Sequence, residues 1–180
     1  MTADAWMKEV RDFWFSVKPE QWWGGSEELD GEIRERFSDL WEEQRQRPAA
    51  DFLVSAQDAL AAVILFDQFP RNMHRGHADQ FSTDTLALAI AKAAVDRGLD
   101  EELQPQERGV LYMPFQHSED LEDQNRSVLL FSSLPDPKQL RFARLHHDVI
   151  ERFGRFPHRN AMLGRTPRQD EIAAGDVVPW

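Results

Sequence analysis

The sequence predicts an all-α protein of about seven to nine helices. Apolar side chains recur every three or four residues along most of the chain, which is typical of amphipathic helices. Residues that favour helix starts, such as Ser26 and Asp136, precede several of these segments, and Gly98 and Gly154 follow two of them. The best strand candidate, Leu111–Met113, is cut short by a proline. We therefore expect helices throughout.

The first two helices are expected over residues 3–17 and 26–47. The apolar stripe of the first consists of Trp6, Val10, Phe13, Trp14 and Val17. The stripe of the second consists of Leu29, Ile33, Phe37, Leu40 and Trp41. Ser26 can cap the second helix, because its hydroxyl can accept a hydrogen bond from a backbone N–H group of the first turn.

A third helix, over about residues 52–69, is apolar on almost every side. Such a helix lies at the centre of a fold. Pro70 is expected to end it. Asp67 near its end is a polar exception, and a carboxylate in such a place must be paired.

The remaining segments each carry their own start or stop signals. In chain order they are a helix from Ser82 or Asp84 to Gly98, a short turn after Pro105, a helix capped by Ser118 with Leu121, Val128 and Leu129 inward, a helix from Asp136-Pro137 to Phe153, and a short last helix with a capping box at Thr166–Gln169.

Length and composition favour one intracellular domain over residues 1–180. A chain of 180 residues can bury about 70% of its unfolded surface, so it can form its own core. It has no cysteine, which excludes disulfides and thiolate chemistry and fits a cytoplasmic location. The first residues lack a signal-peptide pattern. The longest apolar run, Ala59–Phe66, is far shorter than the roughly 20 residues that span a membrane, so we expect no membrane partner.

The charge distribution is uneven. The net charge of −11 argues against nucleic-acid binding, because negative charge repels phosphate backbones. Residues 141–168 contain seven arginines but only two acidic residues, Asp148 and Glu151, a local net charge of +5. This arginine-rich segment is therefore the place where an anionic partner could bind.

Four segments place polar residues where apolar ones are expected, or charged residues beside aromatic ones: 66–72, 113–119, the His146-His147 pair, and 152–165. The candidate catalytic residues in them are Asp67, His117, Glu119, His146 and His158. The candidate ligand-binding residues are Arg71, Asn72, Arg152, Arg155, Arg159, Asn160 and Arg165. Arginine has a planar fork of donors that suits phosphate and carboxylate groups.

Each candidate also has a purely structural interpretation. Asp67 can form a buried ion pair with an arginine that holds the helix end. The arginines of segment 152–165 can pair with acidic residues and fix a turn around Gly154 and Pro157. An inward-facing histidine such as His146 is more often a hydrogen-bonded core residue than a ligand.

The same segments carry a family resemblance. The strings DQFPRN, MPFQHSE and RFGRFPHRN followed by LGR, together with His146, DFWF and LDGEIRERF, resemble the bacterial domain-of-unknown-function 924 family over nearly the whole chain. Residues 22–26 depart from the family pattern, because they lack its charged pair. The resemblance implies a right-handed helical superhelix similar to tetratricopeptide-repeat proteins, and it implies no established activity.

Three functions are compatible with these residues. The favoured hypothesis is a pocket for a small anionic ligand, formed where the four segments converge and serving binding or catalysis. The second is a tetratricopeptide-like scaffold that binds a peptide through arginine and asparagine side chains. The third is a metal-dependent hydrolase, in which three histidines and Asp67 or Glu119 hold the metal. Outside this third hypothesis, none of the candidate residues is assigned as a metal ligand, and the sequence identifies no cofactor.

Overall fold

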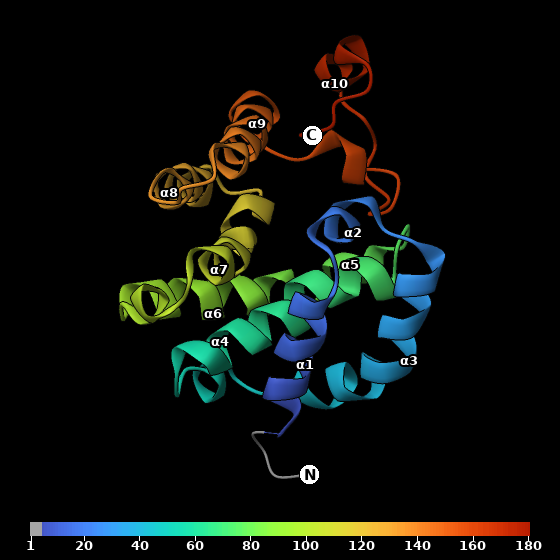
Figure 1. The fold of residues 1–180 in the computed structure, drawn as a ribbon. Helices are drawn as coiled ribbons and strands as arrows, with labels where there is room; N and C mark the ends of the chain where they lie inside the picture. The colour runs from blue at the N-terminus through green and yellow to red at the C-terminus, as the bar shows by residue number, and fades with distance from the viewer. Residues whose placement is uncertain (1–4) are drawn as a thin grey trace. The chain divides into compact units, whose positions relative to one another are not determined.

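A computed structural model describes residues 5–180, apart from the side chains of Pro19 and Trp23. These residues form helices and turns but no strand, which confirms the all-α prediction (Figure 1). The α-helices are α1 (Ala5–Ser16), α2 (Pro19–Gly24), α3 (Glu27–Gln44), α4 (Ala56–Val63), α5 (Phe69–Met73), α6 (Asp84–Asp96), α7 (Pro105–His117), α8 (Leu121–Ser132), α9 (Pro137–Phe153) and α10 (Gln169–Ala174). The short turns of other helix types are η1 (Ala49–Phe52), η2 (Ile64–Gln68), η3 (Ala78–Phe81), η4 (Leu99–Glu102) and η5 (Pro157–Arg159). The predicted start of the first helix at residue 3 lies outside the described residues.

The chain divides into two compact units, one ending at Leu111 and the other comprising Tyr112–Trp180, so that the boundary falls within α7. A single domain and a right-handed, tetratricopeptide-like superhelix both stay predictions. Within the described residues, no helix is long and apolar enough to span a membrane.

The first unit is organised around the run α4–η2–α5, which contacts α1, α3 and α6 (Figure 1). This confirms that the apolar third segment is central. Phe69 from this run packs against three aromatic rings, with centroid distances of 4.6 Å to Phe37, 5.9 Å to Trp14 and 6.0 Å to Phe13. All four side chains are buried, and burial of such large rings is the main stabilising contribution to this core.

The prediction that Pro70 ends the central helix is wrong. The helix widens into a π-type turn at η2, and α5 then continues to Met73 with Pro70 in its first turn. The first turn of a helix tolerates proline, because its N–H groups need no partner within the helix. Single π-turns inside helices frequently mark functional sites, and Asp67 lies in this one.

The expectation of only a short turn after Pro105 is also wrong, because α7 runs from Pro105 to His117 with Pro114 inside it. Three carbonyl oxygens at its end, those of Phe115, Gln116 and Ser118, accept hydrogen bonds from the Gln124 side-chain amide at 3.4, 2.8 and 2.7 Å. A side chain from the next helix thus satisfies acceptors that a helix end leaves without partners.

This role of Gln124 explains a further error, in the inward face predicted for α8. Leu121 and Leu129 are 41% and 70% exposed. The buried residues of α8 are Asp123, Gln124, Ser127 and Phe131. Asp120, not Ser118, caps the helix by accepting from the backbone N–H groups of the first turn.

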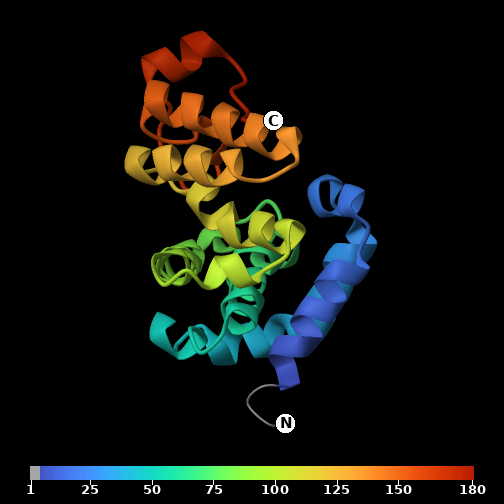
Figure 2. The ribbon, with the colours of Figure 1, turned by 60° about the vertical axis from the view of Figure 1, so that its left-hand side comes forward.

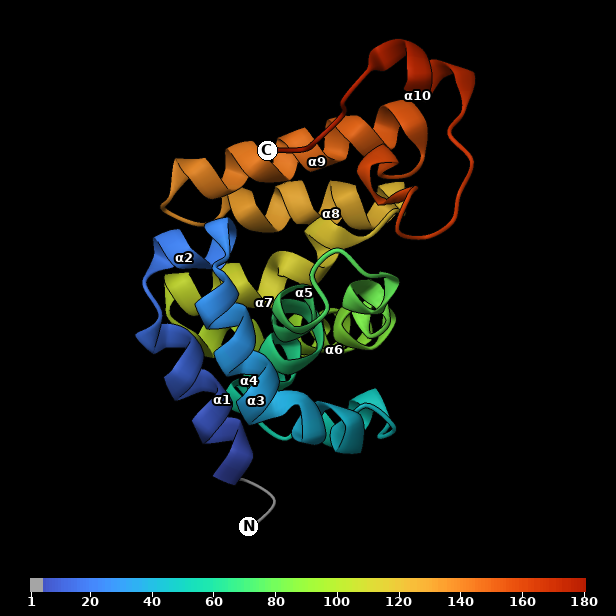
Figure 3. The ribbon, with the colours of Figure 1, turned by 90° about the vertical axis from the view of Figure 1, so that its right-hand side faces the viewer.

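In the second unit, α8 and α9 lie side by side and antiparallel (Figures 2 and 3). As predicted, Asp136 caps α9 and Gly154 ends it in the left-handed conformation. The apolar core next to this end consists of Val149, Ile150, Phe153 and Phe156, with Ala174 and Val177 packed against it. In α10 the capping glutamate is Glu171, whose carboxylate accepts from the Arg168 N–H at 2.7 Å, so the predicted box at Thr166–Gln169 is shifted by two residues.

Gly25→Ala is expected to destabilise the first unit by about 1–2 kcal/mol, because an alanine at φ +59° is strained. A β-carbon there would also overlap the Arg75 guanidinium, which is held by Asp30. Gly31→Ala, within α3 and facing open space, is the matched control and should stabilise by about 0.5–1 kcal/mol. Urea unfolding measures both, and equal effects would contradict the role assigned to Gly25.

Candidate functional site

The predicted site residues are divided between the two units. Asp67, Arg71 and Asn72 belong to the first, and the other candidates belong to the second. Their convergence into one pocket stays a prediction, so each group is described by itself.

In the first unit, Asp67 and Arg71 form the ion pair that the structural interpretation predicts. Asp67 is fully buried and accepts from Gln68 Nε2 at 2.6 Å and from Arg71 Nη1 at 3.4 Å. Arg71 also donates hydrogen bonds to both carboxylate oxygens of Asp84, at 2.8 and 2.9 Å. Burial by itself would lower the pKa of Arg71. The negative charges of Asp67 and Asp84 have a larger effect, so the pKa lies above its ordinary value. This group links the central helix to the start of α6.

Asn72 is buried and donates to Asp30 Oδ1 at 2.8 Å. Arg75 binds the same carboxylate through Nε and Nη2, at 2.5 and 2.9 Å. Sequence reasoning missed Asp30. Its spacing from Ile33 and Phe37 places it on the buried face of α3, and this was the available signal.

In the second unit, the Glu171 carboxylate of α10 accepts hydrogen bonds from three residues. Arg155 binds it at 2.5 and 2.8 Å, Asn160 Nδ2 at 3.0 Å and the Arg168 backbone at 2.7 Å. The hydrogen bond from Arg155 is the main cause that lowers the pKa of Glu171 to about 2. Sequence reasoning missed Glu171 as well, because only folding brings α10 against the turn after α9.

Glu119 connects the end of α7 to the same turn. It accepts two bonds from Arg165, at 2.7 and 3.0 Å, and one from the Phe156 backbone N–H at 2.7 Å. Burial by itself would raise the pKa of Glu119. These hydrogen bonds together have a larger effect, so the pKa lies below its ordinary value. Arg165 also donates to Asn160 Oδ1 at 3.0 Å, which joins the Glu119 and Glu171 groups into one network. Glu119 is therefore a structural acceptor in this unit.

The three predicted histidines lie close together around Phe156. His146 and His158 each have ring centroids 5.6 Å from that of Phe156, and His117 lies 6.3 Å from His146. The Arg159 guanidinium lies 4.5 Å from the Phe156 ring and donates to the His117 carbonyl at 2.9 Å. We call His117, His146, His158 and Arg159 the histidine cluster.

His146 and His158 are both neutral near pH 7. Burial, followed by the charge of His117, lowers the pKa of His146 to about 3. Burial, followed by the charge of Arg159, lowers the pKa of His158 to about 4. His146 Nδ1 lies 2.8 Å from the Phe142 carbonyl, so this nitrogen carries the proton, because a carbonyl can only accept. Sequence analysis had placed His146 inward, and it is buried.

Arg152 is exposed and lies over the Phe153 ring at 4.7 Å, outside the histidine cluster. Within the described part of the chain, the group with the spacing of metal ligands is not the three histidines with Glu119. It is His147, Asp148 and Glu151 on α9.

The fold and the site define an all-α protein with a polar, arginine-rich turn folded beside one buried and two partly buried histidines. The family described as "Bacterial protein of unknown function (DUF924)" matches residues 10–174, and the chain belongs to this family. It is similar to a solved structure, the protein of unknown function ATU0120 from Agrobacterium tumefaciens, at 36% identity, with a TM-score of 0.87, covering 93% of this chain and 95% of that one. No curated protein matches the chain.

Proposed function

We propose that the second unit binds a small anionic ligand, carrying a phosphate or carboxylate group, at the histidine cluster. His158 would hydrogen-bond the ligand, and Arg159 would supply positive charge. The observation that carries the proposal is the state of His158, a neutral imidazole with a buried nitrogen, set among cationic side chains.

His158 Nδ1 is buried and has no hydrogen-bond partner among the described residues. Leaving a buried polar atom without a partner costs roughly 1–3 kcal/mol, and native proteins keep few such atoms. A bound oxygen at this nitrogen would remove that cost. The Trp180 ring lies beside the His158 ring, with 5.0 Å between their centroids and an angle of 77° between their planes.

The electrostatic surroundings favour an anion. Apart from burial, Arg159 has the largest effect and lowers the pKa of His158; Glu119 raises it, and His117 and Arg165 lower it by smaller amounts. The same positive potential that opposes a proton on His158 attracts a negatively charged ligand. This local potential contrasts with the net charge of −11 of the whole chain.

We assign binding and no reaction. A general base works best when its pKa is near the working pH, and pKa values of about 3 and 4 make His146 and His158 weak bases near pH 7. The peptide scaffold and a metal-dependent hydrolase built on the three histidines stay predictions.

Titration calorimetry with inorganic phosphate and with succinate, at constant ionic strength, tests the proposal. We expect saturable binding of at least one of the two anions. His158→Phe, which keeps a ring beside Phe156 but removes the hydrogen bond, should weaken binding at least about tenfold, or about 1.4 kcal/mol. His77→Gln, at an exposed histidine of the first unit, should leave binding unchanged.

A second readout is the ¹⁵N NMR spectrum of the imidazole rings, in which His158 should shift on addition of phosphate and His77 should not. Absence of binding by both anions, or equal binding by wild type and His158→Phe, would rule the proposal out.

A further inference from the structure

We propose that His147, Asp148 and Glu151, on the exposed face of α9, bind one divalent transition-metal ion of the Zn²⁺ type. This inference does not depend on the histidine cluster. His147 follows His146 in the sequence but lies on a different face of the helix, because successive residues are rotated by about 100°.

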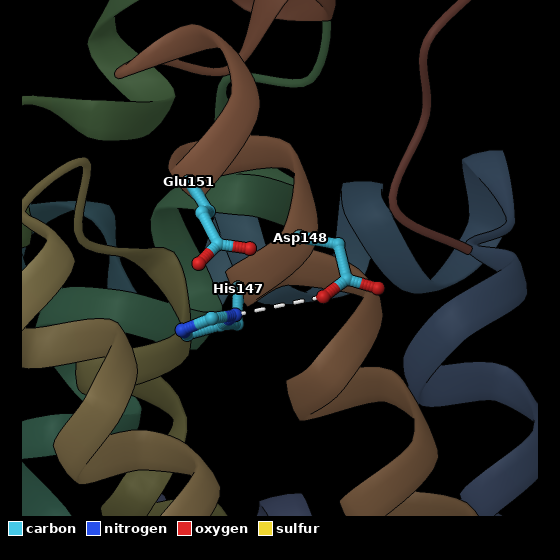
Figure 4. A group of neighbouring side chains, drawn as sticks. All are labelled: His147, Asp148 and Glu151. Carbon is cyan, nitrogen blue, oxygen red and sulfur yellow. Dashed lines mark ion pairs between the residues drawn. The ribbon is translucent and has the colours of Figure 1, made fainter.

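The three side chains offer one ligand atom each, and these atoms lie within 4.8 Å of one another. His147 and Glu151 are four residues apart and therefore share a helix face, while Asp148 reaches the same place from the next position. Figure 4 shows the imidazole and the two carboxylates gathered on one side of α9. A helix thus holds all three ligands on a rigid element.

The His147 ring is fixed from a different helix. Its Nε2 lies 2.9 Å from Asn125 Oδ1 on α8, and because that oxygen is an acceptor, Nε2 must carry the hydrogen. In the neutral ring Nδ1 then has a lone pair, and it lies 3.5 Å from Asp148 Oδ1 (Figure 4). Two acceptors facing each other repel unless a proton or a metal cation lies between them. A histidine whose second nitrogen donates to an oxygen is the usual arrangement of a metal ligand.

The spacing fits a metal ion as well. Two ligand atoms about 2.0–2.1 Å from one tetrahedral Zn²⁺ lie about 3.3 Å apart, close to the 3.5 Å between His147 Nδ1 and Asp148 Oδ1. The His147 side chain is only 19% exposed and so has little freedom, whereas Asp148 is 71% exposed and can adjust.

The donor set selects the kind of metal. An imidazole nitrogen with two carboxylates favours Zn²⁺ and similar transition metals over Mg²⁺ and Ca²⁺, which prefer oxygen ligands alone. The two carboxylates balance the charge of a divalent ion. Three protein ligands leave a fourth position open to water or to an anion.

The test is equilibrium dialysis of the full chain, without an affinity tag and after treatment with a chelator, against Zn²⁺ and, separately, Mg²⁺. We expect one Zn²⁺ per chain and at least tenfold weaker binding of Mg²⁺. Asp148→Asn and Glu151→Gln, both at exposed positions that should not disturb folding, should each weaken Zn²⁺ binding at least about tenfold, as should His147→Gln. Asn125→Ala removes no ligand but should weaken binding about 10–100-fold by releasing the ring.

His77→Gln is the matched control, because His77 Nδ1 lies 3.3 Å from Asp79 in an exposed pair for which the described residues offer no third ligand. It should retain wild-type Zn²⁺ binding. Co²⁺ provides a second readout, since a low-symmetry nitrogen and oxygen site gives visible absorption that Asp148→Asn and Glu151→Gln should reduce. The inference is wrong if wild type binds no Zn²⁺, if these two variants bind as tightly as wild type, or if His77→Gln loses as much affinity as they do.

Discussion

Phe156→Ala is expected to lower the free energy of unfolding by about 3–5 kcal/mol, the usual cost of emptying a fully buried phenylalanine site. The ring lies in the core at the end of α9 and supports three members of the histidine cluster: His146, His158 and Arg159. Its loss should therefore also abolish the phosphate or succinate binding proposed above. Denaturant unfolding and calorimetry measure the two effects.

Phe52→Ala is the matched control for this variant. Phe52 is equally buried, but it lies in η1 of the first unit and packs against Phe66 at 5.2 Å. It should cost a similar free energy of unfolding and leave anion binding intact while the protein is folded. If Phe52→Ala abolished binding as completely as Phe156→Ala, the loss would reflect general destabilisation and not the cluster.

Acid is expected to destabilise the protein well above the pH at which carboxylates titrate. The pKa of His146 is about 3 in the folded protein and near 6.5 in the unfolded chain. Between these values only the unfolded chain takes up the proton, so acid favours unfolding. The stabilising effect of a neutral His146 is complete above pH 6.5 and is lost as the pH falls toward 3. From pH 7 to pH 5 the loss should be about 2 kcal/mol from His146 alone, and His158 acts in the same direction.

His146→Gln tests this pH dependence. The variant should be less stable than wild type at pH 7, but its stability should change less between pH 7 and pH 5, by about 2 kcal/mol. His77→Gln should keep the wild-type pH dependence. The window above pH 5 separates the histidines from Glu119 and Glu171, whose lowered pKa values make them lose their stabilising effect only at lower pH. If the free energy of unfolding of His146→Gln changed between pH 7 and pH 5 as much as that of wild type, burial of this ring would not be the cause of the pH dependence.

Helix periodicity predicted the first unit better than the second. In α3 the spaced apolar residues Leu29, Ile33, Phe37 and Trp41 are buried as expected. In α8 the same kind of reasoning selected Leu121 and Leu129, which are exposed, and overlooked Gln124, which is fully buried. Hydrophobicity alone cannot show that a glutamine is drawn inward by carbonyl oxygens of a helix that precedes it.

The candidate residues were also only partly interpretable from the sequence. Unusual polar residues in apolar segments correctly marked Asp67 and His146 as buried. Their partners were not visible, because Glu171 and Asp84 lie in ordinary acidic helix starts that most sequences contain. A local pattern shows that a charge needs a partner, whereas its identity depends on which distant segment folds against it.

The sequence by itself determined that this protein is built from helices and which segment of the first unit is central. These properties follow from the 3.6-residue repeat and from the cost of burying polar groups, both of which act locally. The tertiary structure alone decided that Arg155 and Arg165 bind glutamates of other segments, that His158 retains a buried nitrogen, and that Asn125 orients His147 beside two carboxylates. Hydrogen bonds depend on distances of a few tenths of an ångström between residues far apart in the chain, and only the folded chain fixes those distances.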